Sequence, residues 1–132
     1  MKILPQLEPY AHALLRIVAG LMFLMHGTQK LFGWPGNDPP IDSWLTLRGA
    51  AGIIEVVCGA LIVVGLMTGI AAFIASGEMA VAYFMVHFGQ SWNPLLNHGE
   101  AAAFYCFLWL YFATHGAGIW SLDHQTRKRP AG

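Results

Sequence analysis

The chain has 132 residues, of which 56% are hydrophobic and only 11% are charged, and its formal net charge is zero. Soluble domains have about 25% charged residues, so this composition does not supply the polar surface that a soluble domain needs. A bilayer removes that need, and the mean hydropathy of +0.52 fits a membrane protein. The zero net charge argues against a nucleic-acid-binding protein, because no basic face is available to neutralise phosphates.

The first apolar segment predicts a transmembrane helix over about residues 11–32. It ends at residues 33–40, where glycines and prolines cannot continue a helix. A second span is predicted over about residues 48–66, and the pair Thr68-Gly69 marks a tight connection after it. The third span follows directly, over about residues 68–88.

Residues 91–94, Ser-Trp-Asn-Pro, break the third span, and the fourth is predicted over about residues 98–120. Each apolar run is close to the roughly 20 residues that cross a bilayer. Four spans and their loops use the whole chain. We therefore predict an all-α fold, a four-helix transmembrane bundle with short loops, as a single domain over residues 1–132.

The positions of Lys and Arg predict the orientation in the membrane. Lys2 precedes the first span and the basic cluster Arg127–Arg129 follows the fourth, whereas the loop after the third span has neither residue type. Because cytoplasmic segments are enriched in Lys and Arg, both termini are predicted to be cytoplasmic. We expect a multi-pass protein of the cell inner membrane.

Small residues predict close helix packing. Gly52 and Gly59 are seven residues apart in the second span, and Ala72, Ser76 and Ala80 are spaced by four in the third. Such stripes let two helix backbones approach each other within a membrane, where no hydrophobic driving force brings helices together.

Ionisable side chains inside the predicted spans are unusual, because each costs on the order of 3 kcal/mol at a helix centre. At 1.5 Å rise per residue, Glu78 falls near the midplane, Glu55 roughly 3 Å outward of it and His26 roughly 6 Å outward. Lys30 and Glu100 come at roughly 12 Å on the same side. We therefore predict a polar pocket in the outer half of the bundle, formed by His26, Lys30, Glu55, Glu78 and Glu100.

Helical periodicity adds secondary candidates to this pocket. At about 100° per residue, Arg16, His26 and Lys30 fall within an arc of about 80°, so the first helix has one polar stripe. Arg48 and Glu55 share a face of the second helix because they are seven residues apart. The secondary candidates are Arg16, Arg48 and His115.

Two other histidines are predicted to lie outside the pocket. His87 comes out about 180° from Glu78 on the third helix, and His98 about 160° from Glu100 on the fourth. The predicted site therefore contains neither of them.

Structural roles compete with a functional role for these residues. Lys30 can extend its ammonium to the outer interface. Asn97 and Glu100 have the spacing of a capping box, with Asn97 as the N-cap. Glu55 and Glu78 lie deepest, so they need a partner, a proton or a cavity, and a structural ion pair is the alternative for them.

The polar set is compatible with a proton-coupled ligand such as a quinone. A histidine would hydrogen-bond a carbonyl oxygen of the quinone while a carboxylate exchanges the proton. A metal site is not favoured, because no span has a Glu-x-x-His or His-x-x-x-His pair. The cofactor therefore stays open, with a quinone as the candidate and no metal ligands assigned.

The chain resembles the DoxX family of small bacterial and archaeal membrane proteins from about residue 14 to residue 123. The motifs behind the resemblance are Arg16-x3-Gly20, His26-Gly27-x2-Lys30-Leu31-Phe32-Gly33, Glu55-x3-Gly59, Glu78-Met79-Ala80, Asn97-x-Gly99-Glu100 and Gly116-x-Gly118-x2-Ser121-x-Asp123. The resemblance implies a four-helix membrane bundle. It also implies a redox-associated role, because the family name refers to thiosulfate:quinone oxidoreductase subunits and some relatives associate with oxidative-stress proteins.

Two functions are therefore hypothesised. The first is a membrane subunit of a quinone-linked oxidoreductase system, whose redox partner subunit is a separate chain. The second is a non-enzymatic docking or assembly protein, or a small transporter, in which the charges form structural ion pairs. Both hypotheses place the protein in a lipid bilayer, as a homo- or hetero-oligomer, and neither involves nucleic acid.

Overall fold

The computed structural model describes residues 3–37 and 39–127, and this part of the chain is helical with no strand. The fold class predicted from the sequence is thus confirmed as all-α. Two short elements are a 3-10 turn before the first helix and a π-helical turn after the third. In chain order the elements are η1 (Pro5–Leu7), α1 (Glu8–Phe32), α2 (Leu47–Val64), α3 (Thr68–Ala82), η2 (Tyr83–His87), α4 (Glu100–His115) and α5 (Leu122–Arg127).

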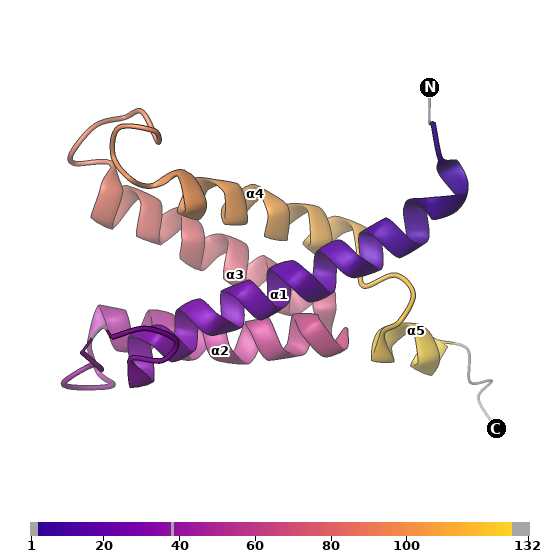
Figure 1. Cartoon of the computed structure of the whole chain (residues 1–132), viewed down its shortest axis with the longest axis horizontal. Coiled ribbons are helices and arrows are strands. Elements are labelled where there is room, and N and C mark those ends of the chain that lie inside the picture. The colour runs from indigo at the N-terminus through magenta and orange to yellow at the C-terminus, as the bar shows by residue number, and fades with distance from the viewer. Residues whose placement is uncertain (1–2, 38, 128–132) are drawn as a thin grey trace.

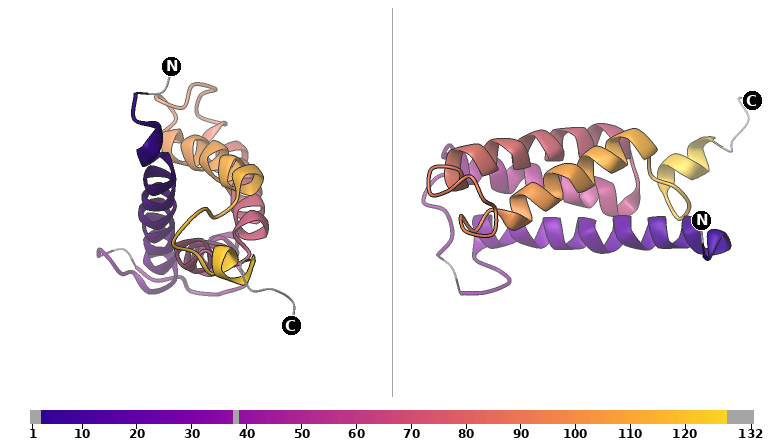
Figure 2. Two further views of the ribbon diagram at one scale, coloured as in Figure 1. Left: turned by 90° about the vertical axis from the view of Figure 1, so that its right-hand side faces the viewer. Right: turned by 90° about the horizontal axis from the view of Figure 1, so that it is seen from above.

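The four longer helices lie side by side and form two pairs, α1 with α2 and α3 with α4, joined by the tight turn between α2 and α3 (Figure 1). An end-on view shows them around a ring in the order α1, α2, α3, α4 (Figure 2, left). The first and last described elements, η1 and α5, lie at one end of the bundle, and the two longer loops, before α2 and before α4, lie at the other. The two pairs diverge toward the loop end.

Within the described residues, three helical segments are long and apolar enough to cross a membrane: Pro5–Phe32 with 28 residues, Leu47–Val64 with 18 and Thr68–His87 with 20. Their outer surfaces are apolar, and Phe73 on α3, for example, is 68% exposed. Helices that are apolar on the outside as well as the inside are typical of membrane proteins. Helix α4 has 16 residues, so it is shorter than these three segments and than the fourth span predicted from the sequence.

Helices α1 and α2 approach each other closely at glycines of both helices, among them Gly59 of the stripe predicted from the sequence. A Cβ atom on Gly27 would lie 2.7 Å from the backbone nitrogen of Val56. A Cβ atom on Gly59 would lie 2.8 Å from the backbone nitrogen of Leu24. Any larger residue would push the helices apart, so these glycines allow the backbone contact.

Two predicted spans end differently in the structure. The fourth span is predicted to reach residue 120, but α4 ends at His115 because Gly116 adopts a positive φ of 85°. The third span is predicted as one helix to residue 88. Instead, α3 gives way to the π turn η2, where the Phe88 N–H donates to the carbonyl of Tyr83, five residues back, at 2.9 Å.

Arg16 links the end of α2 to the segment after α4, at the end of the bundle where η1 and α5 lie. It is fully buried, and its guanidinium donates to the carbonyls of Ile62 (2.7 Å) and Val63 (2.6 Å), which end α2. Three further bonds reach carbonyls of the segment after α4: Ala117 (2.9 Å), Ile119 (3.3 Å) and Trp120 (2.6 Å). Arg16 therefore supplies the donors that these carbonyls need inside an apolar bundle.

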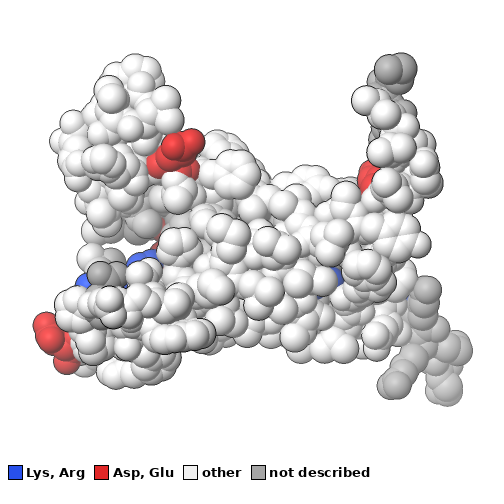
Figure 3. Space-filling view, in the orientation of Figure 1, with Lys and Arg blue, Asp and Glu red and all other residues white. Residues whose placement is uncertain are grey.

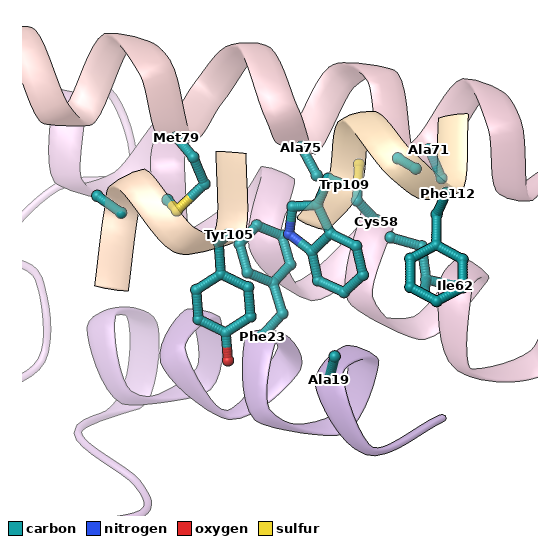
Figure 4. Packing of buried hydrophobic residues seen from close by; sticks show 12 residues of the cluster. Ala19, Phe23, Cys58, Ile62, Ala71, Ala75, Met79, Tyr105, Trp109 and Phe112 are labelled. Atoms are coloured by element: carbon teal, nitrogen blue, oxygen red, sulfur yellow. The ribbon is translucent and has the colours of Figure 1, made fainter. Parts of the chain in front are cut away.

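An aromatic core lies between the two helix pairs (Figure 4). Tyr105 and Trp109 of α4 stack with their ring centroids 5.6 Å apart, and Phe23 of α1 packs edge-on against Trp109. Figure 4 shows the Tyr105 hydroxyl directed toward α1. The core thus closes the centre of the bundle and forms the floor of the cavity at its loop end.

Candidate functional site

A cavity of about 820 Å³ opens between the helix pairs, at the loop end of the bundle. In Figure 3 a hollow lies on the left, between the two helix pairs, with Lys and Arg atoms on its lower wall. All four longer helices contribute to the wall, which is mainly apolar. The polar residues that line it are His26, Gln29, Lys30, Arg48, Glu55, Glu78, His87 and Tyr105.

Lys30 of α1 and Glu55 of α2 form an ion pair in the cavity wall. Their exposure differs, since the Lys30 side chain is 29% exposed and that of Glu55 only 1%. The second carboxylate oxygen of Glu55, Oε2, is buried and has no hydrogen-bond partner among the described residues. The pair is held in place because the glycine contacts bring α1 and α2 together beside it. One oxygen of a buried carboxylate beside the cavity thus lacks a hydrogen-bond partner.

Glu78 of α3 is a second carboxylate on the same cavity. Its side chain is half-buried, and its Oε2 atom is buried without a hydrogen-bond partner in the described part of the chain. Glu78 interacts electrostatically with both Glu55 and Lys30. Lys30 can neutralise one carboxylate, so the cavity wall has two acids, Glu55 and Glu78, and one ammonium. Such a site suits a ligand that gives or takes a proton.

His26 of α1 and Tyr105 of α4 are neighbours in the cavity wall. Their rings meet edge to face with centroids 6.0 Å apart. His26 is exposed to the cavity, whereas Tyr105 is 7% exposed. Tyr105 is not among the residues predicted from the sequence, because a phenol is neutral and its burial in a span costs too little to make it conspicuous. Its position four residues before Trp109 on the inward face of α4 is the signal that could have found it.

His87 lines the cavity, although helical periodicity predicted it on the far side of the third helix. The reason is the π turn η2, which adds one residue to a turn and rotates the residues after it by about 100°. The Nδ1 atom of His87 is 3.0 Å from the carbonyl oxygen of Asn97. This contact ties the π turn to the loop before α4. His87 therefore faces the cavity and not the side of the third helix that its periodicity predicted.

Glu100 lies outside the cavity. It is the exposed first residue of α4, and Gly99 rather than Asn97 is the N-cap. Asn97 is fully buried and holds the loop instead: its amide donates to the Ser91 carbonyl (2.8 Å) and to the Tyr83 hydroxyl (3.1 Å). The structure thus brings together four of the five predicted pocket residues, His26, Lys30, Glu55 and Glu78, and not Glu100.

The secondary candidates lie in three different places. Arg48 is exposed at the rim of the cavity, while Arg16 belongs to the carbonyl network at the other end of the bundle. His115 is also at that end, with its ring centroid 4.6 Å from that of His12. His12 bonds the carbonyl of Gly116 at 2.9 Å, so it helps to fix the chain after α4. Across residues 3–37 and 39–127, no group of three His, Cys, Asp or Glu side chains is placed to hold a metal ion.

Comparison with known proteins identifies the family to which the chain is similar. The model of the DoxX family matches residues 11–88, more than half of the chain. An uncharacterized protein of Haemophilus influenzae is 42% identical over 137 residues, which cover 98% of this chain and 100% of that protein. The uncharacterized membrane protein Rv3486 of Mycobacterium tuberculosis is 29% identical over 132 residues, covering 87% of this chain and 80% of that protein. No solved structure matches the chain.

Proposed function

The chain belongs to the DoxX family of membrane proteins, and we propose that it is a membrane subunit of a quinone-linked oxidoreductase system. The observation that supports this most is the cavity itself. An apolar space of about 820 Å³ has an ion pair and an unpartnered buried carboxylate oxygen in its wall. Ligand sites are typically apolar cavities of this size with a few placed polar groups.

The head group of a quinone matches these groups. Its ring is apolar, and its two carbonyl oxygens accept hydrogen bonds, which Lys30, His26 and Tyr105 can donate. Reduction to the quinol takes two electrons and two protons. The electrons come from a redox partner protein, which is a separate chain, and the protons have to reach the quinone oxygens inside the bundle.

The two carboxylates have different roles in this proposal. Glu55 is almost fully buried and is bound to Lys30, so it positions that ammonium against the ligand. Glu78 has no ion-pair partner among the described residues, and it gives one of the two protons to a quinone oxygen. His26, which lies beside Tyr105 in the cavity wall, orients the second carbonyl of the quinone.

We propose the following arrangement in the membrane. The helices α1, α2, α3 with η2, and α4 each cross the bilayer, as one four-helix domain over residues 1–132. Both termini face the cytoplasm, which places the cavity in the outer half of the inner membrane. The protein acts as part of a homo- or hetero-oligomer with its redox partner.

The first test is quinone binding by the purified full-length protein in nanodiscs, measured with ubiquinone and menaquinone by quenching of tryptophan fluorescence. Redox activity is measured as quinone reduction in membranes of a deletion strain that produces each variant. Glu78→Gln should bind quinone within about threefold of the wild type but lower the rate by about 100-fold, the usual effect of removing a positioned proton donor.

Glu100→Gln is the matched control, because it removes a carboxylate that lies outside the cavity. It should leave both binding and rate unchanged. The proposal is refuted if the wild-type protein binds neither quinone, or if Glu78→Gln leaves the rate at the wild-type level.

A docking or assembly protein, or a small transporter, is the second candidate. The Lys30–Glu55 pair favours it, because an ion pair between two helices can be structural and need not bind a ligand. For a docking protein, wild-type protein without quinone binding should still co-purify with a membrane-associated partner. The Glu78→Gln variant should retain that partner.

A further inference from the structure

The cavity has a second, apolar side, which lies between α2 and α3. We call it the α2–α3 groove and define it by Leu47, Ala50, Ile74, Gly77, Val81 and Met85, all of which line the cavity. Four of these side chains are largely exposed: Leu47 at 68%, Ile74 at 47%, Val81 at 52% and Met85 at 63%. They therefore face both the cavity and the surroundings of the bundle.

The direction of the groove follows from the helical positions of its residues. Ile74, Gly77 and Val81 fall within an arc of about 60° on α3. This arc is roughly 140° from Ser76, whose hydroxyl donates to the Cys106 carbonyl on α4 at 2.7 Å. The groove thus opens away from α4, on the side where α2 and α3 diverge toward the loops (Figure 1). Both helices are candidate membrane spans, so this opening faces acyl chains rather than water.

The opening of the cavity at the loop end is polar, whereas the α2–α3 groove is apolar. Lys30, Arg48 and His87 line that end of the cavity, so it is polar. Glu78 follows Gly77 directly in α3 and lies where the groove meets the polar part of the cavity. A molecule with a polar head at Glu78 and a long apolar tail in the groove would match both parts.

We propose that the α2–α3 groove receives the isoprenoid tail of the quinone, so that the site takes long-tailed, lipid-soluble quinones directly from the bilayer. This proposal rests on the proposed function, because it extends the same site. It predicts that tail and head are recognised separately. The tail is recognised by apolar contact in the groove, and the head by the charged groups of the cavity.

Gly77 allows the groove to be blocked without disturbing the fold. A Cβ atom placed on Gly77 has no atom within 4 Å, so a side chain there would project into open space in the groove. Gly77→Trp should fill the groove, whereas Gly77→Ala adds one methyl group and leaves it open. Ile70→Trp is the bulky control, because Ile70 is 59% exposed on α3 and does not line the cavity.

The experiment compares two naphthoquinones in nanodiscs: a menaquinone with a full isoprenoid tail and menadione, which has none. Gly77→Trp should weaken binding of the tailed quinone by about tenfold or more, since two buried methylene groups already account for that factor. Menadione binding should stay within about threefold of the wild type, because the head site is untouched. Gly77→Ala and Ile70→Trp should bind both quinones like the wild type.

The outcomes separate this inference from the proposed function. If Gly77→Trp binds the tailed quinone like the wild type, or loses both quinones equally, the groove does not take the tail, although the cavity remains a quinone site. If the wild-type protein binds neither quinone, the proposed function fails and the inference fails with it. Native mass spectrometry that finds a phospholipid displaced by Gly77→Trp, with no quinone on the wild type, overturns the inference in favour of a lipid.

Discussion

Replacing Lys30 with methionine should destabilise the protein far more than removing its partner Glu55. The two side chains form an ion pair, but Glu55 is 1% exposed and Lys30 29% exposed. In Lys30→Met the carboxylate of Glu55 is left buried with no positive partner, which costs about 3–5 kcal/mol in the free energy of unfolding. In Glu55→Leu the ammonium still reaches the mouth of the cavity and still interacts with Glu78. The cost there should be about 1 kcal/mol.

The double variant Lys30→Met/Glu55→Leu tests the same asymmetry. It replaces both charges with apolar side chains of similar shape, which is often nearly neutral for a buried pair. It should therefore be more stable than Lys30→Met alone by about 2 kcal/mol or more, a coupling expected of residues in direct contact. Arg48→Met is the control, because it removes an exposed cation at the cavity rim, and it should change stability by less than about 0.5 kcal/mol.

Equilibrium unfolding in mixed detergent and SDS micelles, followed by circular dichroism, gives the free energy of each variant. The reasoning is refuted if Glu55→Leu costs as much as Lys30→Met. It is also refuted if the double variant is as unstable as Lys30→Met alone.

Two further predictions concern the end of the bundle where η1 and α5 lie. Arg16 donates five hydrogen bonds to carbonyls, whereas a lysine has three donors. Arg16→Lys should therefore lower the free energy of unfolding by about 3 kcal/mol or more. An unchanged midpoint of thermal unfolding would contradict a stabilising role for these hydrogen bonds. Asp123 accepts the backbone N–H groups of Met67 (2.8 Å) and Thr68 (3.0 Å) at the start of α3. Burial raises the pKa of Asp123, but these hydrogen bonds outweigh it and hold the pKa below its usual range. The stabilisation is thus present above about pH 4 and is lost as the pH falls through the folded-state pKa. Asp123→Asn should lower the free energy of unfolding by about 1 kcal/mol at pH 7. It should also flatten the dependence of stability on pH below about 4. An equal dependence of stability on pH below about 4 in the wild type and the variant would contradict this role of Asp123.

Four of the five residues of the predicted pocket line one cavity, and the two differences between prediction and structure have local physical causes. Lys30, Glu55, Glu78 and His26 line one cavity because each lies at a depth and on a face that a regular helix fixes. His87 joined them because a π turn rotated it, and periodicity at about 100° per residue cannot anticipate an inserted residue. Glu100 lies outside because α4 begins at that residue, and helix ends depend on the loop that leads into them.

The sequence by itself determined that this is an all-helical membrane protein of the DoxX family with acids and bases inside its spans. It did so because apolar runs of bilayer length, glycine spacing and the cost of buried charge are local properties. Tertiary structure alone decided which charges meet. Lys30 pairs with Glu55 because α1 lies directly against α2. The hydrogen-bond donors of Arg16 are occupied by carbonyls of two segments that are distant in the sequence. The groove beside Gly77 likewise exists only because α2 and α3 diverge, a property of helix packing that no single helix encodes.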